Sequence, residues 1–141
     1  MFNNRAKSFV TIMVVVALSA LLLRLAIHRI IVYKIEQNQL LAQVNLKLLS
    51  TALENYAKDN KNVYPENVDL LTKANPVYLE KDYLAAPAVG GYEYDCQRLD
   101  ATGYNCTASP VNSQFSGKMV YVASTGGLII AQGVIKNKTG N

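Results

Sequence analysis

Residues 9–23, FVTIMVVVALSALLL, decide how this chain is organised. The run has no charged side chain, glycine or proline, and helix-favouring sequence continues past it to about Asn60. At about 1.5 Å of rise per residue it spans roughly 22 Å, which is short of the roughly 30 Å hydrocarbon core of a membrane. Extension of the segment to Ile27 reaches that length but includes Arg24. An arginine near a helix end is tolerated, because its side chain can extend the charge to the headgroups. We therefore predict a membrane-spanning segment over residues 9–27.

The flanks of this run leave its orientation and its processing open. Arg5 and Lys7 precede it and favour a cytoplasmic N-terminus, whereas Arg24 and Arg29 follow it and weaken that bias. A basic start, an apolar middle and the small residues of the stretch 17–20 (ALSA) also fit a secretory signal peptide. The helical pattern continues through that cleavage point, which favours a retained stalk.

The sequence beyond the stalk has room for one small domain. We predict a leader over residues 1–8, a stalk helix over 9–60 and a globular head over 61–141. A head of about 80 residues has a modest core that needs reinforcement. Its cysteines, Cys96 and Cys106, predict a disulfide, because an exported domain with an even pair usually oxidises it. Closing a loop of about eleven residues contributes on the order of 3 kcal/mol. Two buried thiols are the alternative.

Charge is unevenly distributed along the chain, whose net charge is +4. All ten acidic residues fall between Glu36 and Asp100, and the last 41 residues contain three lysines and no acid. A basic tail can bind DNA, an anionic lipid or an acidic neighbouring subunit. A solvated end over residues 136–141 is the simpler interpretation, so nucleic acid is a disfavoured partner.

The second half of the stalk has the pattern of an amphipathic helix. One side is apolar at helical spacing and is predicted to pack on the head. Its residues are Leu41, Val44, Leu48, Leu49, Ala52, Leu53 and Tyr56. The residues assigned to the solvent side are Gln39, Gln43, Lys47, Ser50, Glu54 and Lys58. The helix is expected to end near residues 59–60, because polar residues cluster there and Pro65 soon follows.

The start of the head predicts a short helix and then a loop. Asn67 can cap a helix over residues 68–73, which Leu70 and Leu71 would anchor. Residues 74–91 show no sustained period and contain two prolines and two glycines, so a loop is expected to cross the head.

Past residue 91 the apolar period changes from 3.6 to 2, which is typical of strands. The alternating apolar residues are Tyr92, Tyr94 and Cys96 in one run and Tyr104, Cys106 and Ala108 in the next. If Cys96 lies opposite Cys106, antiparallel pairing places Tyr94 opposite Ala108, and all six share one face. Further strands over 118–123 and 128–135 flank a turn at 124–127. The predicted fold class is α+β: a long N-terminal helix, half transmembrane and half amphipathic, on an antiparallel meander of about four strands.

Several strings of the sequence resemble the type IV pilin superfamily, especially the pseudopilins of type II secretion. The string 52–60, ALENYAKDN, followed by Tyr64, Pro65 and two leucines, is similar to the family's helix exit. The strings 103–110 (GYNCTASP) and 117–126 (GKMVYVASTG) resemble the paired strands that end many pilin-like heads. The separation of Phe9 and Tyr56 is within about two residues of the family's spacing.

The resemblance implies a structural subunit of a type IV pilus or a type II secretion-type pseudopilus. It further implies a pilin-like fold, assembly with copies of itself or sibling pilins, and a filament at the cell surface. Before assembly the subunit would sit in the bacterial inner membrane with a periplasmic head. The residues of the implied assembly helix are Phe9, Thr11, Met13, Val16, Ala17, Ala20 and Arg24.

The N-terminus departs from the family at two positions. A prepilin peptidase usually cuts after a glycine, and methylation follows, but Ser8 precedes Phe9 here; Ala6 and Lys7 form the alternative site. A glutamate is usual five residues into the mature chain, where this sequence has Met13 or, with the alternative site, Thr11. Without that carboxylate, register in a filament would depend on apolar packing alone.

Motifs for catalysis or metal binding are missing from the sequence. The single histidine, His28, lies in the stalk, and there is no P-loop, GxGxxG or HExxH string. No acid follows Asp100, which argues against the calcium site of the major pseudopilins. We predict no enzyme activity, no metal and no cofactor. A non-polymerising, membrane-anchored module that binds DNA or a partner protein is the alternative function.

Overall fold

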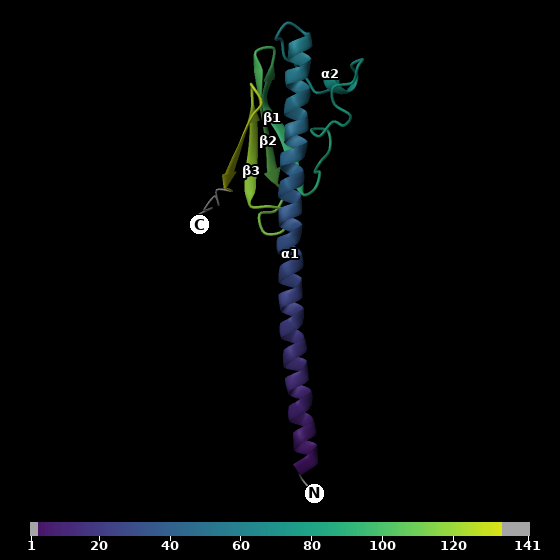
Figure 1. Ribbon diagram of the computed structural model, residues 1–141, viewed down its shortest axis with the longest axis vertical. Helices are drawn as coiled ribbons and strands as arrows, with labels where there is room; N and C mark the ends of the chain where they lie inside the picture. The colour runs from purple at the N-terminus through teal and green to yellow at the C-terminus, as the bar shows by residue number, and fades with distance from the viewer. Residues whose placement is uncertain (1–2, 134–141) are drawn as a thin grey trace. The chain divides into compact units, whose positions relative to one another are not determined.

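A computed structural model describes the backbone of residues 3–133 and the side chains of residues 8–133. The chain divides into two compact units, Met1–Lys34 and Ile35–Asn141. Its elements in chain order are α1 (Asn3–Asp59), α2 (Asp69–Thr72), β1 (Tyr92–Asp100), β2 (Gly103–Pro110), β3 (Met119–Ser124) and β4 (Leu128–Gly133) (Figure 1). The predicted α+β class with a long N-terminal helix and a four-stranded antiparallel sheet is confirmed.

The helix α1 contributes to both units. It begins at Asn3, earlier than the predicted start at Phe9, and ends at Asp59 as expected. No glycine or proline occurs within it, so nothing in its backbone chemistry interrupts the hydrogen-bond ladder. At its end, Asn60 Nδ2 donates to the carbonyl oxygen of Tyr56 at 2.8 Å and satisfies one of the free carbonyls of the last turn.

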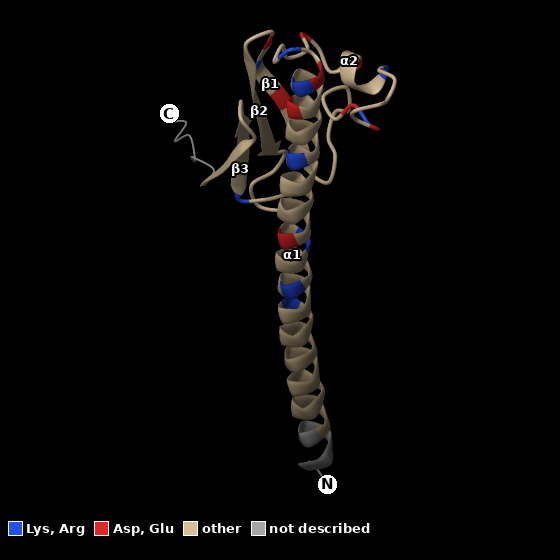
Figure 2. Cartoon of the chain, turned by 45° about the horizontal axis from the view of Figure 1, so that its top comes forward, with Lys and Arg blue, Asp and Glu red and all other residues tan. Residues whose placement is uncertain are grey.

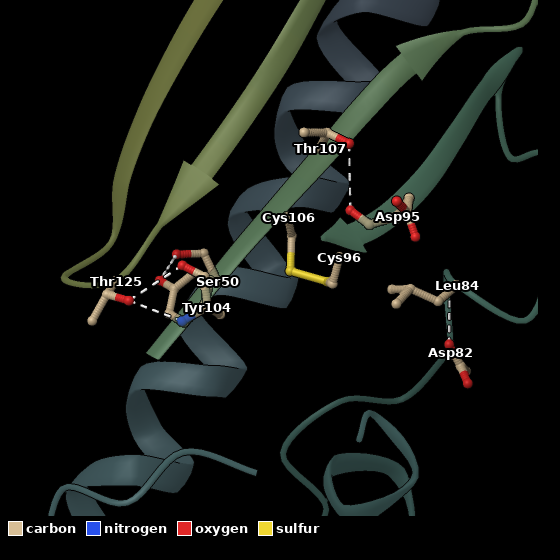
Figure 3. Close-up of a disulfide and its surroundings, with 9 residues drawn as sticks. All are labelled: Ser50, Asp82, Leu84, Asp95, Cys96, Tyr104, Cys106, Thr107 and Thr125. Atoms are coloured by element: carbon tan, nitrogen blue, oxygen red, sulfur yellow. Dashed lines mark hydrogen bonds between the residues drawn. A yellow bond between two sulfur atoms is a disulfide. The ribbon is translucent and has the colours of Figure 1, made fainter. Parts of the chain in front are cut away.

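The sheet is a meander in the order β1-β2-β3-β4, and every neighbouring pair is antiparallel. Cys96 lies opposite Cys106 and Tyr94 opposite Ala108, which confirms the predicted register. A disulfide joins the two cysteines across β1 and β2 (Figure 3). The pairing of β1 with β2 shifts its register between Cys96 and Arg98. Beyond this irregularity β1 continues to Asp100, past the alternating run that the sequence showed. The last two residues of the predicted fourth strand lie outside the described residues.

The face that α1 presents to the sheet differs from the predicted one. Leu49, Ala52 and Leu53 are buried as expected, but Leu41, Val44 and Leu48 are 43–50% exposed. The buried residues of α1 in the second unit are Ile35, Ala42, Asn45, Leu46, Leu49, Ser50, Ala52, Leu53 and Ala57. The assignment of Leu41, Val44 and Leu48 to the packed side was wrong, as was that of Ser50 to the solvent side.

Tyrosine hydroxyls on the sheet explain this rotation of the packed face. Tyr94, Tyr104 and Tyr121 point at α1 from three neighbouring strands and are all buried. Asn45 Nδ2 donates to Tyr94 Oη at 3.0 Å, and Ser50 Oγ lies 2.8 Å from Tyr104 Oη. A buried hydroxyl without a partner is costly, so the helix must supply polar groups on its packed side.

The connection between helix and sheet is mostly irregular chain, as predicted. Asn67 Oδ1 accepts a bond from the Leu70 amide at 3.2 Å, which supports the short helix α2. No helix or strand follows until β1, but Leu79 and Tyr83 from this loop are buried in the core. The loop therefore covers part of the hydrophobic core.

Candidate functional site: the uncovered apolar helix

The apolar part of α1 in the first unit is uncovered. The helix Ser8–Asp59 includes a window long and apolar enough to cross a membrane, and none of that window is buried. Large side chains such as Phe9, Met13 and Val16 are 58–64% exposed. A membrane anchor and a signal sequence near the N-terminus have this same character, so length and composition alone do not separate them.

Helical geometry groups most of the implied assembly residues on one side. At about 100° per residue, Phe9, Met13, Val16, Ala17, Ala20 and Arg24 fall within an arc of about 100°. We call these six residues the assembly stripe. Thr11 lies on the opposite side of the helix. Ala17 and Ala20 lie about midway along the length of the stripe, with Ala17 at one edge of its arc, and their small side chains permit a neighbouring helix to approach closely.

The candidate processing residues lie within α1. Ser8 and Phe9 are exposed and helical, and Ala6 and Lys7 are helical with side chains outside the described part. Among the described residues, no catalytic side chain lies beside the Ser8–Phe9 bond or the Ala6–Lys7 bond. Cleavage at these positions stays a prediction.

Basic residues follow the apolar part within the first unit. Arg24, Arg29 and Lys34 are all exposed. The two ion pairs among the described residues are Asp69–Lys73 and Arg98–Asp100, so neither involves these cations. Figure 2 colours the basic residues blue and the acidic residues red. The chain has no acidic residue before Glu36.

Within the second unit, Glu54 of α1 is the centre of a hydrogen-bond network that the sequence did not reveal. Its Oε1 accepts bonds from Tyr104 Oη at 2.9 Å and from the Gly126 amide at 2.7 Å. Its Oε2 accepts a bond from Tyr64 Oη at 3.0 Å. Burial, reinforced by Glu54, raises the pKa of Tyr104 to about 12, and the same two causes raise the pKa of Tyr64. The assignment of Glu54 to a solvated side was therefore wrong.

This network fastens the helix to the last hairpin. Tyr104 also bonds Ser50, and its backbone amide donates to Thr125 Oγ1 at 2.9 Å (Figure 3). The alternating tyrosines were a usable signal, because each core-facing hydroxyl needs a partner and α1 was the available source. Both Glu54 oxygens already accept hydrogen bonds, which favours a structural role over a catalytic one.

Among the hollows lined by described residues are two in the second unit, and neither of these has the side chains of an active site. One, of about 600 Å³, lies beside Cys96 and is lined partly by Glu66, Asp69 and Asp82. Asp69 pairs with Lys73, and Asp82 Oδ1 accepts the Leu84 amide at 2.8 Å. The other, of about 390 Å³, lies between α1 and the loop that contains Val77. No group of three His, Cys, Asp or Glu within residues 8–133 is placed to hold a metal ion.

Comparisons of the chain with protein-family models, with curated proteins and with solved structures found no significant match.

Proposed function

We propose that this chain is a structural subunit of a type IV pilus or a type II secretion-type pseudopilus. In this proposal the subunit resides in the bacterial inner membrane before assembly, with its head in the periplasm. It then assembles through the assembly stripe with copies of itself or with sibling subunits. A prepilin peptidase is the proposed processing enzyme.

One observation carries the proposal: a single helix has an uncovered apolar part and a part that packs on a disulfide-bonded sheet. A soluble domain has no use for so many exposed apolar residues in one run. A lipid bilayer or a bundle of similar helices would cover them, and close packing of small residues stabilises such bundles. The disulfide supports a head outside the cytoplasm, where thiols oxidise.

A second candidate function has its own observation. Arg24 ends the assembly stripe, and no acid precedes Glu36, so parallel copies would bring like charges together. This favours a membrane-anchored binding module that does not polymerise with itself. Assembly beside a sibling helix of different charge avoids the same difficulty, so we retain the subunit as the first proposal.

The test is to look for the native chain in sheared filaments. We expect Val16→Lys to abolish recovery in the filament fraction, because the new charge interrupts the apolar stripe. Leu128→Lys is the matched control, since Leu128 is 57% exposed in the head and should tolerate the charge. Recovery only with membranes, beside a functioning prepilin peptidase, would refute the subunit proposal.

Mass analysis of the mature N-terminus tests processing. A methylated Phe9 or Lys7 supports cleavage by a prepilin peptidase. An intact Met1 supports the anchored module, and a start near Ala20 or Leu21 supports a signal peptide.

A further inference from the structure

Three cations encircle α1 where its apolar part ends. We call Arg24, Arg29 and Lys34 the basic girdle; all three are exposed, and Tyr33 beside them is 65% exposed. At about 100° per residue, Arg29 lies about 140° around the helix from Arg24, and Lys34 about another 140° further. The girdle therefore has a cation on every side of the helix, whereas the assembly stripe occupies about 100° of it.

The axial positions of the girdle match a membrane boundary. Residues 9–27 span about 28 Å as a helix, close to the hydrocarbon thickness of about 30 Å. Arg24 then lies one turn inside the boundary, from which its side chain can reach outward. Lys34 lies about 10 Å beyond Ile27, near the outer limit of the headgroup layer. Tyr33 supplies an aromatic ring at the depth where membrane proteins concentrate tyrosine and tryptophan.

Acidic side chains of the described residues form no ion pair with the girdle, although Glu36 follows Lys34 by two residues. Neither of the two ion pairs in the described part includes a girdle cation, and the sequence before Glu36 has no acid. Arginine and lysine near lipid are stabilised by anionic groups, above all by phosphate oxygens. A partner helix with a carboxylate could reach one side of α1, whereas a layer of lipid phosphates would surround the helix and could reach all three cations.

We infer that the basic girdle binds the phosphate groups of anionic phospholipids in the leaflet on the head side of the membrane. This inference rests on the membrane insertion in the proposed function but not on filament assembly. Cations on the exported side oppose the usual charge bias of membrane insertion, so orientation does not account for them. Binding of anionic lipid gives them a role and holds the subunit at a defined depth before assembly.

The test measures which lipid surrounds the full-length chain in vesicles. The chain has no tryptophan, so Ile27→Trp places one fluorescent reporter at the predicted boundary. Brominated phosphatidylglycerol, mixed into phosphatidylcholine, should quench this tryptophan more than brominated phosphatidylcholine does at the same mole fraction. The expected preference is several-fold, with an upper limit of about five-fold for each cation. It should decrease in 1 M salt, which screens charges beyond about 3 Å.

Matched variants distinguish an effect of the girdle cations from an effect of the chain's total positive charge. Replacing Arg24, Arg29 and Lys34 by glutamine should reduce the preference to none. Replacing Lys47, Lys58 and Lys118 by glutamine removes the same charge from the second unit and should leave the preference unchanged. Equal quenching by both lipids in the chain with an intact girdle overturns the inference and leaves the filament test untouched. Quenching by neither lipid overturns it together with membrane insertion.

Discussion

The two parts of α1 differ in where their polar residues lie and in what covers their apolar ones. In residues 8–34 the apolar side chains surround the helix and are nearly all exposed. In residues 35–59 one face is buried, and it includes Asn45 and Ser50 with leucines beside them. Four leucine or valine side chains on the same part, those of Leu40, Leu41, Val44 and Leu48, stay exposed. Contact with a tyrosine-rich sheet thus requires a face that mixes polar and apolar side chains, whereas the uncovered part has apolar side chains on every side.

The largest expected effect separates the buried and exposed leucines of the second part. Leu53→Ala should lower the free energy of unfolding by about 2–5 kcal/mol, because Leu53 is fully buried and leaves a cavity. Leu48→Ala should lower it by less than about 1 kcal/mol, since Leu48 is 50% exposed. Urea unfolding of the full chain in detergent, followed by near-UV circular dichroism, measures both. Equal losses of unfolding free energy in the two variants would indicate that Leu48 is packed, as the sequence pattern predicted.

The disulfide gives the next largest effect. Replacing Cys96 and Cys106 by serine should lower the free energy of unfolding by about 3 kcal/mol, from loop-closure entropy alone. The same urea titration measures it, and reduction of the wild-type chain should produce a similar loss. The loss should not extend to the helicity of residues 8–34, because the disulfide lies wholly within the second unit. A loss of helicity in residues 8–34 on reduction would contradict this prediction.

The polar face of α1 can be tested at one hydroxyl. Tyr104→Phe should lower the free energy of unfolding by about 1.5–3 kcal/mol, because the hydroxyl donates to the charged Glu54 and also contacts Ser50. Tyr33→Phe is the matched control, since that ring is 65% exposed and should change stability by less than about 0.5 kcal/mol. Thermal and urea unfolding in the same detergent compare them. An unchanged stability of Tyr104→Phe would contradict the idea that buried tyrosine hydroxyls require polar side chains on the packed face of α1.

The smallest effect is a decrease of stability at alkaline pH. Burial raises the pKa of Tyr92 and of Tyr104 to about 12, against an ordinary value of 10. Between these values the folded state binds more protons than the unfolded state, so the unfolding free energy falls as pH rises. The stabilisation should be complete below about pH 10 and decrease as pH approaches about 12. Ultraviolet titration of tyrosinate alongside urea unfolding checks the two together, with Tyr104→Phe showing a smaller decrease.

The register of the sheet was predictable because local and distant constraints agreed. Alternation placed Tyr94 and Cys96 on one face, and the cysteine pair then left a single antiparallel register with β2. The packed face of α1 was not predictable by the same means, because several apolar stripes run along that helix. The choice among them depended on where Tyr94, Tyr104 and Tyr121 place their hydroxyls, which is a property of the assembled sheet.

The amino-acid sequence by itself determined the uncovered helix, its end, the disulfide and the order of the strands. Each of these follows from patterns within a few residues or from one covalent pair. Only the tertiary structure decided that Glu54 fastens the last hairpin and that Leu41, Val44 and Leu48 remain exposed. Those outcomes depend on matching hydrogen-bond donors and acceptors between elements some fifty or more residues apart, and periodicity along one element does not encode that match.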